Sequence, residues 1–217
     1  MGRRLLALLL VALAVPAFAA AAAADKEKVH VTAEGQAAAR AALPRPADFG
    51  TGWTSKTYKP SLDGGFSCGS FDPKQSDLVR NGAAGVRFTH PGLEVDTETQ
   101  VLQTPHMVTL DWQRTVLPPQ VLPCMRSSVA KSLPAGATIV SVKRTGFPHV
   151  ATYSNAFRIL LDLTSSGQTV HMFVDIAVFG RGRTEITMTT TAPLAAAAVV
   201  RASEVRLARL LTARVTA

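Results

Sequence analysis

The sequence predicts an α+β domain in which helices pack mainly on one face of an antiparallel β-sheet. Extended runs joined by tight turns fill residues 137–191, the pattern of an antiparallel meander in the C-terminal half. Two further strands and helical stretches precede this meander, and an amphipathic helix closes the chain. No strand–helix–strand unit repeats, which argues against a doubly wound parallel sheet.

The N-terminal residues have the composition of a secretory signal peptide and not of a folded element. A basic Gly2-Arg3-Arg4 start precedes an apolar run over residues 5–15, and A-x-A cleavage sites lie between Ala19 and Ala24. The apolar run is too short to span a bilayer, and no other stretch is long enough to be a membrane helix. We therefore expect a signal peptide over 1–24 and one exported α+β domain over 25–217.

The composition is basic, with 23 Lys and Arg against 15 Asp and Glu and a formal net charge of +8. Loss of the two leader arginines leaves about +6, which attracts anionic envelope polymers, headgroups and glycans non-specifically. The sequence contains no basic helix interleaved with aromatic residues and no known nucleic-acid module, so no nucleic-acid partner is expected. About 190 residues are enough for one core, and we expect a monomer.

The first half of the mature chain predicts a helix, a loop and two strands. An Ala-rich helix is expected over 32–43, behind a threonine N-cap and before a proline. Residues 59–74 are rich in Gly, Ser, Asp and Pro and predict a loop. Strands are expected at 85–90 and 93–104, separated by a Pro-Gly turn.

The second half predicts a helical pair, four strands and a closing helix. The expected ranges are 105–116 and 120–132 for the helices, 137–145, 156–164, 168–179 and 184–191 for the strands, and 193–212 for the last helix. Apolar residues alternate through the meander with period two. The closing helix is expected to cover the apolar face with Leu207 and Leu211, leaving Arg158, His171 and Phe173 on the free face.

Two cysteines, Cys68 and Cys124, predict one disulfide. An even count in an exported chain makes a bridge the default interpretation. A metal pair or a reactive thiol are the alternatives, but no histidine lies at a spacing that would complete a zinc site. The bridge would tie the 59–74 loop to the body of the domain.

Three segments carry a resemblance to a known group of proteins. They are ADFGTGW after the first helix, a cysteine-bearing helix that ends in SLPAGA, and AFRILLDL followed by VDIAVFGRGRTEITMT. Together they resemble exported actinobacterial domains that include the extracellular sensor domain of mycobacterial Ser/Thr kinases and related lipoproteins. The resemblance covers most of the mature chain and implies a sensor-like, non-catalytic domain. Those sensor domains carry two disulfides around a cleft, whereas this chain can form one and has no kinase or membrane segment.

A short motif raises the alternative of a secreted serine hydrolase. Residues 65–69 match G-x-S-x-G, with Ser67 as nucleophile and Asp162 and His171 following in α/β-hydrolase order. The context does not fit, because no buried strand precedes the motif and no helix follows it. Cys68, the expected disulfide cysteine, is also the neighbour of the nucleophile. We expect no enzyme, and this hydrolase is the alternative.

Glu94, Asp96 and Glu98 share one face of a predicted strand. They could form a hard-cation site or an acid–base pair, or a solvated face opposite Arg or Lys, and the last is the expectation. The five histidines show no metal-ligand spacing. No metal and no cofactor are expected.

The leading hypothesis is a secreted, non-enzymatic binding or sensor-like domain, with an unknown ligand that includes anionic envelope components among the candidates. Its ligand would lie between the sheet and the helices or along an edge. Aromatic groups could line such a cleft or belong to the core, and charged turns could bind an anion or keep sheet edges from pairing. The candidate ligand-binding residues are Trp53, Trp112, Tyr153, Arg158, His171, Arg181 and Arg183, with Lys143 and Arg144 adding to a basic rim.

Overall fold

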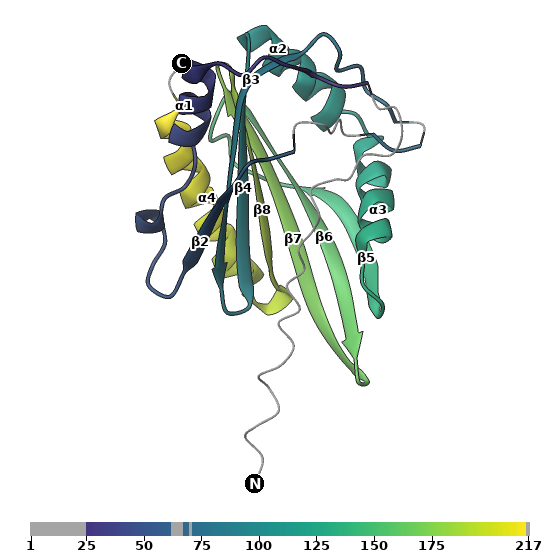
Figure 1. Cartoon of the computed structure of the whole chain (residues 1–217). Helices are drawn as coiled ribbons and strands as arrows, with labels where there is room; N and C mark the ends of the chain where they lie inside the picture. The colour runs from purple at the N-terminus through teal and green to yellow at the C-terminus, as the bar shows by residue number, and fades with distance from the viewer. Residues whose placement is uncertain (1–24, 62–66, 70, 216–217) are drawn as a thin grey trace.

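A computed structural model of the chain describes residues 25–61, 67–69 and 71–215. The expected signal peptide lies outside the described residues. The strands form one eight-stranded sheet in the order β1-β3-β4-β8-β7-β6-β5, with β2 also pairing with β3 (Figure 1). Only the short β1–β3 pairing is parallel within this described sheet. The strands are β1 (Lys28–Val29), β2 (Thr54–Tyr58), β3 (Val79–His90), β4 (Leu93–Leu102), β5 (Ala137–Thr145), β6 (Tyr153–Ser165), β7 (Gln168–Arg181) and β8 (Thr184–Pro193).

The predicted α+β class and the C-terminal meander are confirmed, because β5, β6, β7 and β8 are consecutive antiparallel neighbours. The predicted helices also form, and a π-helical turn extends α2. The helical elements are α1 (Ala33–Ala41), η1 (Pro46–Asp48), α2 (Pro105–Asp111), η2 (Trp112–Val116), α3 (Val121–Ser132), η3 (Leu194–Ala196) and α4 (Ala197–Arg214). None of the helices in the described part of the chain is both long and apolar enough to cross a bilayer.

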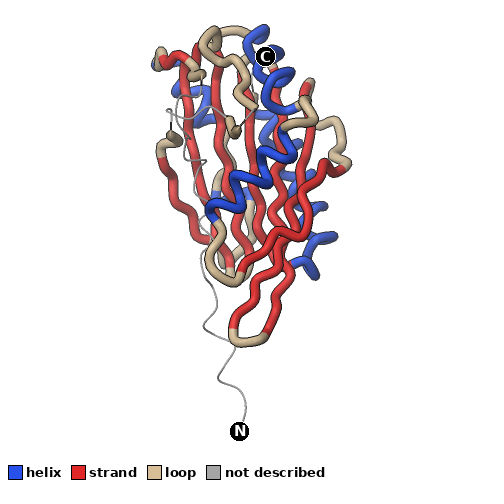
Figure 2. The backbone as a smooth tube through the Cα atoms, turned by 90° about the vertical axis from the view of Figure 1, so that its right-hand side faces the viewer, coloured by secondary structure: helices blue, strands red, loops and turns tan. Residues whose placement is uncertain are grey.

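The distribution of the helices differs from the expectation that one face carries most of them. α1 and α4 cover one face, and α2, η2 and α3 cover the other; Figure 2 looks onto the face that carries α3. The reason is visible in β7. Phe173, Ala177 and Phe179 point to one side and Val174 and Ile176 to the other, and all five are buried. Both faces of the central strands are therefore apolar and both require cover.

The position of the closing helix follows from the same alternation. Leu207 and Leu211 of α4 pack in the cluster that contains Phe179, and Val200 packs on Phe173. The face that was expected to remain free thus lies under α4. The opposite face, with Phe157, Ile159 and Leu161, packs against η2 and α3.

The disulfide between Cys68 and Cys124 is confirmed. It joins the segment before β3 to the first turn of α3 across 56 residues of sequence. Closing a loop of this length restricts the unfolded chain, an effect worth roughly 4 kcal/mol in the chain-entropy model. The bridge thereby fixes the start of α3 to the N-terminal half of the domain.

Candidate functional site

A cleft of about 850 Å³ opens at one end of the sheet, on the face that carries α3. Three segments surround it: the β3–β4 turn with the adjoining strand ends, the loop from α3 to β5, and the lower part of the β6–β7 hairpin. In Figure 1 this hairpin extends below the other strands. The volume falls within the range of about 300–1,000 Å³ that is usual for small-molecule sites.

One side of the cleft is a row of polar side chains on four neighbouring strands. Thr54 of β2 pairs with Thr89 of β3, Thr89 with Glu94 of β4, and Glu94 with Thr191 of β8. Directly paired residues of antiparallel strands point to the same face, so the four side chains stand side by side. All four line the cleft, and we call them the polar row. The Thr54 and Thr89 hydroxyl oxygens are 2.7 Å apart and share a hydrogen bond.

The other side of the cleft is apolar. Leu163 of β6 pairs with Val170 of β7, and Met172 lies two residues further along on the same face. The α3–β5 loop adds Pro134 and Ala135, and we call these five residues the apolar wall. Val170 is 51% exposed although it belongs to a strand of the central meander. An exposed valine beside a formed cleft is apolar surface that a ligand can cover.

The loop of the apolar wall is held against β6 by Gly136. This residue has a φ of +83°, and a Cβ atom at its position would lie 2.4 Å from the Thr164 carbonyl oxygen. The Gly136 carbonyl accepts a 2.8 Å hydrogen bond from the Thr164 amide. Only glycine combines this backbone conformation with such a close approach. The loop and the hairpin therefore form one continuous wall.

The charged groups near the polar row belong to a network centred on Arg87. Its guanidinium donates to Asp96 at 2.7 Å, and its Nε lies 3.4 Å from a Glu94 carboxylate oxygen. The Tyr58 hydroxyl lies within hydrogen-bond distance of both Asp96 and Glu98, the latter at 2.9 Å. The predicted common face of Glu94, Asp96 and Glu98 is present, and an arginine lies opposite Asp96 as expected. The face is not solvated as predicted, because the Glu94 and Asp96 side chains are only 21% and 14% exposed.

Burial changes the acidity of this network. Loss of hydration raises the pKa of Glu94, with Arg87 opposing the change. Desolvation likewise raises the pKa of Glu98, and burial beside two carboxylates raises the pKa of the Tyr58 phenol far above its usual range. Among the described residues, no group of three or more His, Cys, Asp or Glu side chains has an arrangement that could hold a metal ion.

The three aromatic candidates lie outside the cleft lining. Trp53 contacts Phe49 with ring centroids 4.8 Å apart, and it lines a separate cavity of about 200 Å³ beside α4. Trp112 is buried under the sheet, with the Tyr153 ring centroid 5.2 Å away. The Tyr153 hydroxyl is 2.6 Å from that of Thr109. These contacts place the three aromatic side chains in or beside the hydrophobic clusters.

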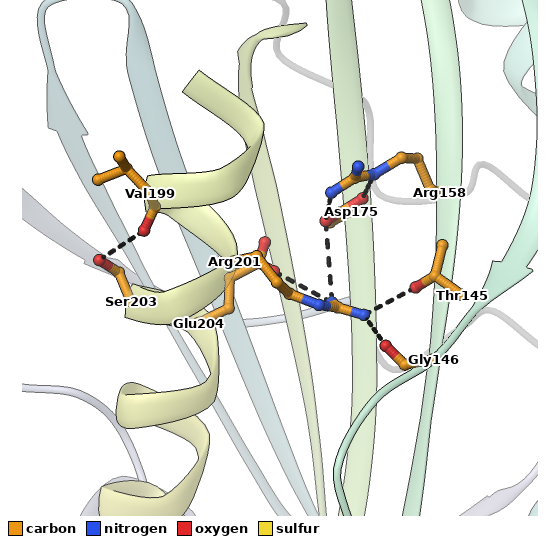
Figure 3. Close-up of polar contacts among 8 residues, drawn as sticks. All are labelled: Thr145, Gly146, Arg158, Asp175, Val199, Arg201, Ser203 and Glu204. Atoms are coloured by element: carbon orange, nitrogen blue, oxygen red, sulfur yellow. Dashed lines mark hydrogen bonds and ion pairs between the residues drawn. The ribbon is translucent and has the colours of Figure 1, made fainter. Parts of the chain in front are cut away.

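Arg158 lies under α4 in a network of ion pairs (Figure 3). Its guanidinium makes two 2.6 Å contacts with Asp175, whose side chain is fully buried. From α4, Arg201 approaches Asp175 at 3.9 Å and also contacts Glu204 at 3.2 Å and Thr145 at 2.9 Å. Arg158 faces away from the cleft, because it alternates with Ile159, which packs on the α3 side.

The hydrolase candidates are only partly brought together. Asp162 and His171 form a cross-strand pair with a 2.6 Å contact to the histidine Nδ1. Ser67 is next to Cys68, which is bonded to Cys124 at the start of α3. Asp162 lies beside Leu163, whose partner Ala137 follows the other end of α3. Ser67 and the Asp162–His171 pair therefore lie near opposite ends of α3, a 12-residue helix about 18 Å long. A catalytic triad requires hydrogen-bond contact between nucleophile and base, so these three residues do not form one.

The arginines of the expected basic rim have separate partners. Arg183 forms a 2.6 Å ion pair with Glu34, and Arg181 is exposed beside it at the β7–β8 turn. This turn lies at the opposite end of the sheet from the cleft, since Thr184 pairs with Val101 while Thr191 pairs with Glu94. Arg144 donates to the carbonyl oxygens of Val116, Leu117 and Pro118.

The cleft itself was missed by sequence reasoning. Its lining comes from strand ends and loops that are far apart in the chain, so no local motif marks it. The sequence does contain one signal of the cleft. The alternation of apolar residues in the β6–β7 hairpin continues through Leu163 and Val170, and α3, with 12 residues, is too short to cover the hairpin that far. Apolar residues past the end of the covering helix indicate surface left for another contact.

No protein-family model matches the chain, and no curated protein matches it. Two solved structures show a distant likeness. One is an uncharacterised Mycobacterium smegmatis protein, the ortholog of Rv0999, with 12% identity, coverage of 79% of this chain and 93% of that chain, and a TM-score of 0.43. The other is LpqN, described as involved in cell envelope biogenesis of Mycobacterium tuberculosis, with 11% identity, coverage of 70% and 79%, and a TM-score of 0.30. Both similarities are too weak to transfer a ligand or an activity.

Proposed function

We propose that this protein is an exported, non-enzymatic binding domain whose ligand occupies the cleft between the polar row and the apolar wall. The observation that carries the proposal is the cleft itself: a volume of about 850 Å³ with polar groups gathered on one side and apolar groups on the other. Such a division suits a small amphipathic ligand. The N-terminal leader pattern and the disulfide support an exported location.

The proposal is tested with Nile red, an uncharged dye whose fluorescence rises in apolar surroundings. The intact domain should bind the dye saturably. Val170→Asp places a carboxylate in the apolar wall and should weaken dye binding by about tenfold or more, because burying that charge against apolar groups is unfavourable.

Val140→Asp is the matched control. Val140 is 53% exposed, close to the 51% of Val170, and it lies on the edge strand β5 outside the cleft lining. This control should bind the dye like the unmodified protein. Equal losses in the two variants, or the absence of saturable binding, would show that the cleft is not a ligand site.

The serine hydrolase is the second candidate, and the 2.6 Å Asp162–His171 contact is the observation in its favour. A fluorophosphonate probe should leave the protein unlabelled if the domain only binds. Labelling that disappears in Ser67→Ala would establish a serine nucleophile and overturn the non-enzymatic assignment.

A further inference from the structure

The charge of the cleft lining is negative although the chain as a whole is basic. Glu94 is the one acidic side chain among the described lining residues, and neither lysine nor arginine is among them. The remaining polar lining consists of hydroxyl and amide groups and His90. An anionic head group that entered this cleft would meet a carboxylate without a lining cation to balance it.

The nearest arginine is already engaged. Arg87 donates to Asp96 through both Nε and a terminal nitrogen at 2.7 Å, whereas its approach to Glu94 is longer, at 3.4 Å. Among the described residues, Glu94 accepts no hydrogen bond within the usual geometric limits. Its side chain is only 21% exposed. A carboxylate that is largely shielded from water and lacks a hydrogen-bond donor is stabilised by a further donor that carries positive charge.

The neighbours of Glu94 in the polar row fit the same kind of donor. Thr89 and Thr191 flank it on the adjacent strands, and their hydroxyl oxygens can accept additional hydrogen bonds. The apolar wall lies across the cleft, so a chain attached to the donor would lie against Val170, Leu163 and Met172. The two sides of the cleft therefore match the two parts of one amphipathic molecule.

We propose that the cleft selects amphiphiles with a cationic, hydrogen-bond-donating head, such as a primary ammonium on an apolar chain, and that Glu94 is the residue that determines this selectivity. The proposal rests on the proposed function, because it names the ligand class of the same cleft. It also separates the specific ligand from the anionic polymers that the overall positive charge attracts elsewhere on the surface.

Three probes with the same tail and different heads test the selectivity: dodecylammonium, dodecanol and dodecanoate, each titrated against bound Nile red. The two ionic probes are kept below their micellar concentrations and dodecanol below its solubility limit. Dodecylammonium should bind about tenfold more tightly than dodecanol, and dodecanoate should bind most weakly. If dodecanoate binds as tightly as dodecylammonium, the selectivity is absent while the binding function stands. If none of the probes displaces the bound dye, the proposed ligand class is wrong, and only the absence of saturable dye binding removes the proposed function as well.

Glu94→Gln should reduce the affinity for dodecylammonium by about tenfold and leave the affinity for dodecanol unchanged. Glu34→Gln is the matched control, since Glu34 is an exposed carboxylate paired with Arg183 at the far end of the sheet. Equal effects of the two substitutions would contradict a role for Glu94.

A measurement on the unmodified protein guards against misfolding of Glu94→Gln. Acidification that protonates Glu94 should lower the affinity for dodecylammonium, whose own charge does not change, and should not alter the affinity for dodecanol. Arg87 and Asp96 are the charged neighbours of Glu94, and His90 lines the same cleft. The titration is therefore repeated on His90→Gln, which should show the same loss of affinity. A constant ratio of the two affinities across the titration would overturn the assignment.

Discussion

At the scale of single residues, burial separates the charged groups that hold the fold from those that can meet a ligand. Asp175 is fully buried under α4, and its two contacts with Arg158 satisfy the carboxylate. Such a pair contributes little net stability, but removal of one partner leaves an uncompensated charge inside. Glu94 differs because it borders the cleft and keeps capacity for another donor.

Glu204 gives a prediction about pH. Burial, reinforced by the charge of Asp175, raises the pKa of Glu204 from 4.5 to about 7. The folded protein therefore holds this proton more tightly than the unfolded chain does. The contribution of Glu204 to the free energy of unfolding is greatest below pH 4.5 and declines as the pH rises to about 7.

Glu204→Gln should remove this decline, which amounts to about 3 kcal/mol at most. Urea unfolding of both proteins on the two sides of this pH window measures the difference. Glu34→Gln, at an exposed position, serves as the control and should behave like the unmodified protein. The same pH dependence in Glu204→Gln and the unmodified protein would refute the assignment.

At the scale of elements, close approach of backbones explains how α1 lies on the sheet. A Cβ atom at Gly82 of β3 would stand 2.3 Å from the Gly35 backbone of α1, and one at Gly35 would stand 2.5 Å from the Asn81 carbonyl oxygen. The helix and strand are thus in contact through their main chains. The small residues in the first half of β3 have a packing role.

Gly82→Ala should lower the free energy of unfolding by about 3 kcal/mol, because α1 must move away from the sheet. Thermal or urea unfolding provides the measurement. Gly146→Ala is the control, since nothing lies within 4 Å of a Cβ atom at Gly146. Similar stability of the two variants would mean that α1 adjusts without loss.

The elements that could be predicted are those with strong local patterns. Alternating apolar residues and the turns at Gly167 and Gly182 specified the meander. β3 begins at Val79, six residues before its expected start, because its first half contains small residues that propensity disfavours in strands. The covered faces were misassigned because the face that carries Phe173 with Arg158 and His171 was expected to remain free, whereas Phe173 and Phe179 on it are buried. Only the packing of α4 on them shows otherwise.

At the scale of the whole molecule, the domain has three layers: α1 and α4, the sheet, and α2 with α3 (Figure 1). η2, α3 and the meander meet in one hydrophobic cluster. The disulfide links this side to the segment before β3. The candidate site could not be predicted because the cleft exists only when the α3–β5 loop, the hairpin and the β3–β4 turn are assembled.

The disulfide gives a prediction at this scale. Replacing Cys68 and Cys124 together with serine should lower the free energy of unfolding by about 4 kcal/mol, because the unfolded chain regains its freedom. Chemical unfolding of the oxidised protein and of the double variant measures the change. Thiol titration of the unfolded, unreduced protein should find no free thiol, and two free thiols would show that the bridge is absent.

The position of α4 has a consequence for the order in which the domain is completed. The helix that covers the Arg158–Asp175 pair is the last one in the described chain. When the chain emerges N-terminus first, from a ribosome or through a translocation channel, the sheet can assemble while this pair is still hydrated. Only the arrival of residues 197–214 excludes water from it and closes the second hydrophobic layer. Completion of the native state therefore depends on α4, and a chain that stalls before it leaves the part of this face that carries the Arg158–Asp175 pair uncovered.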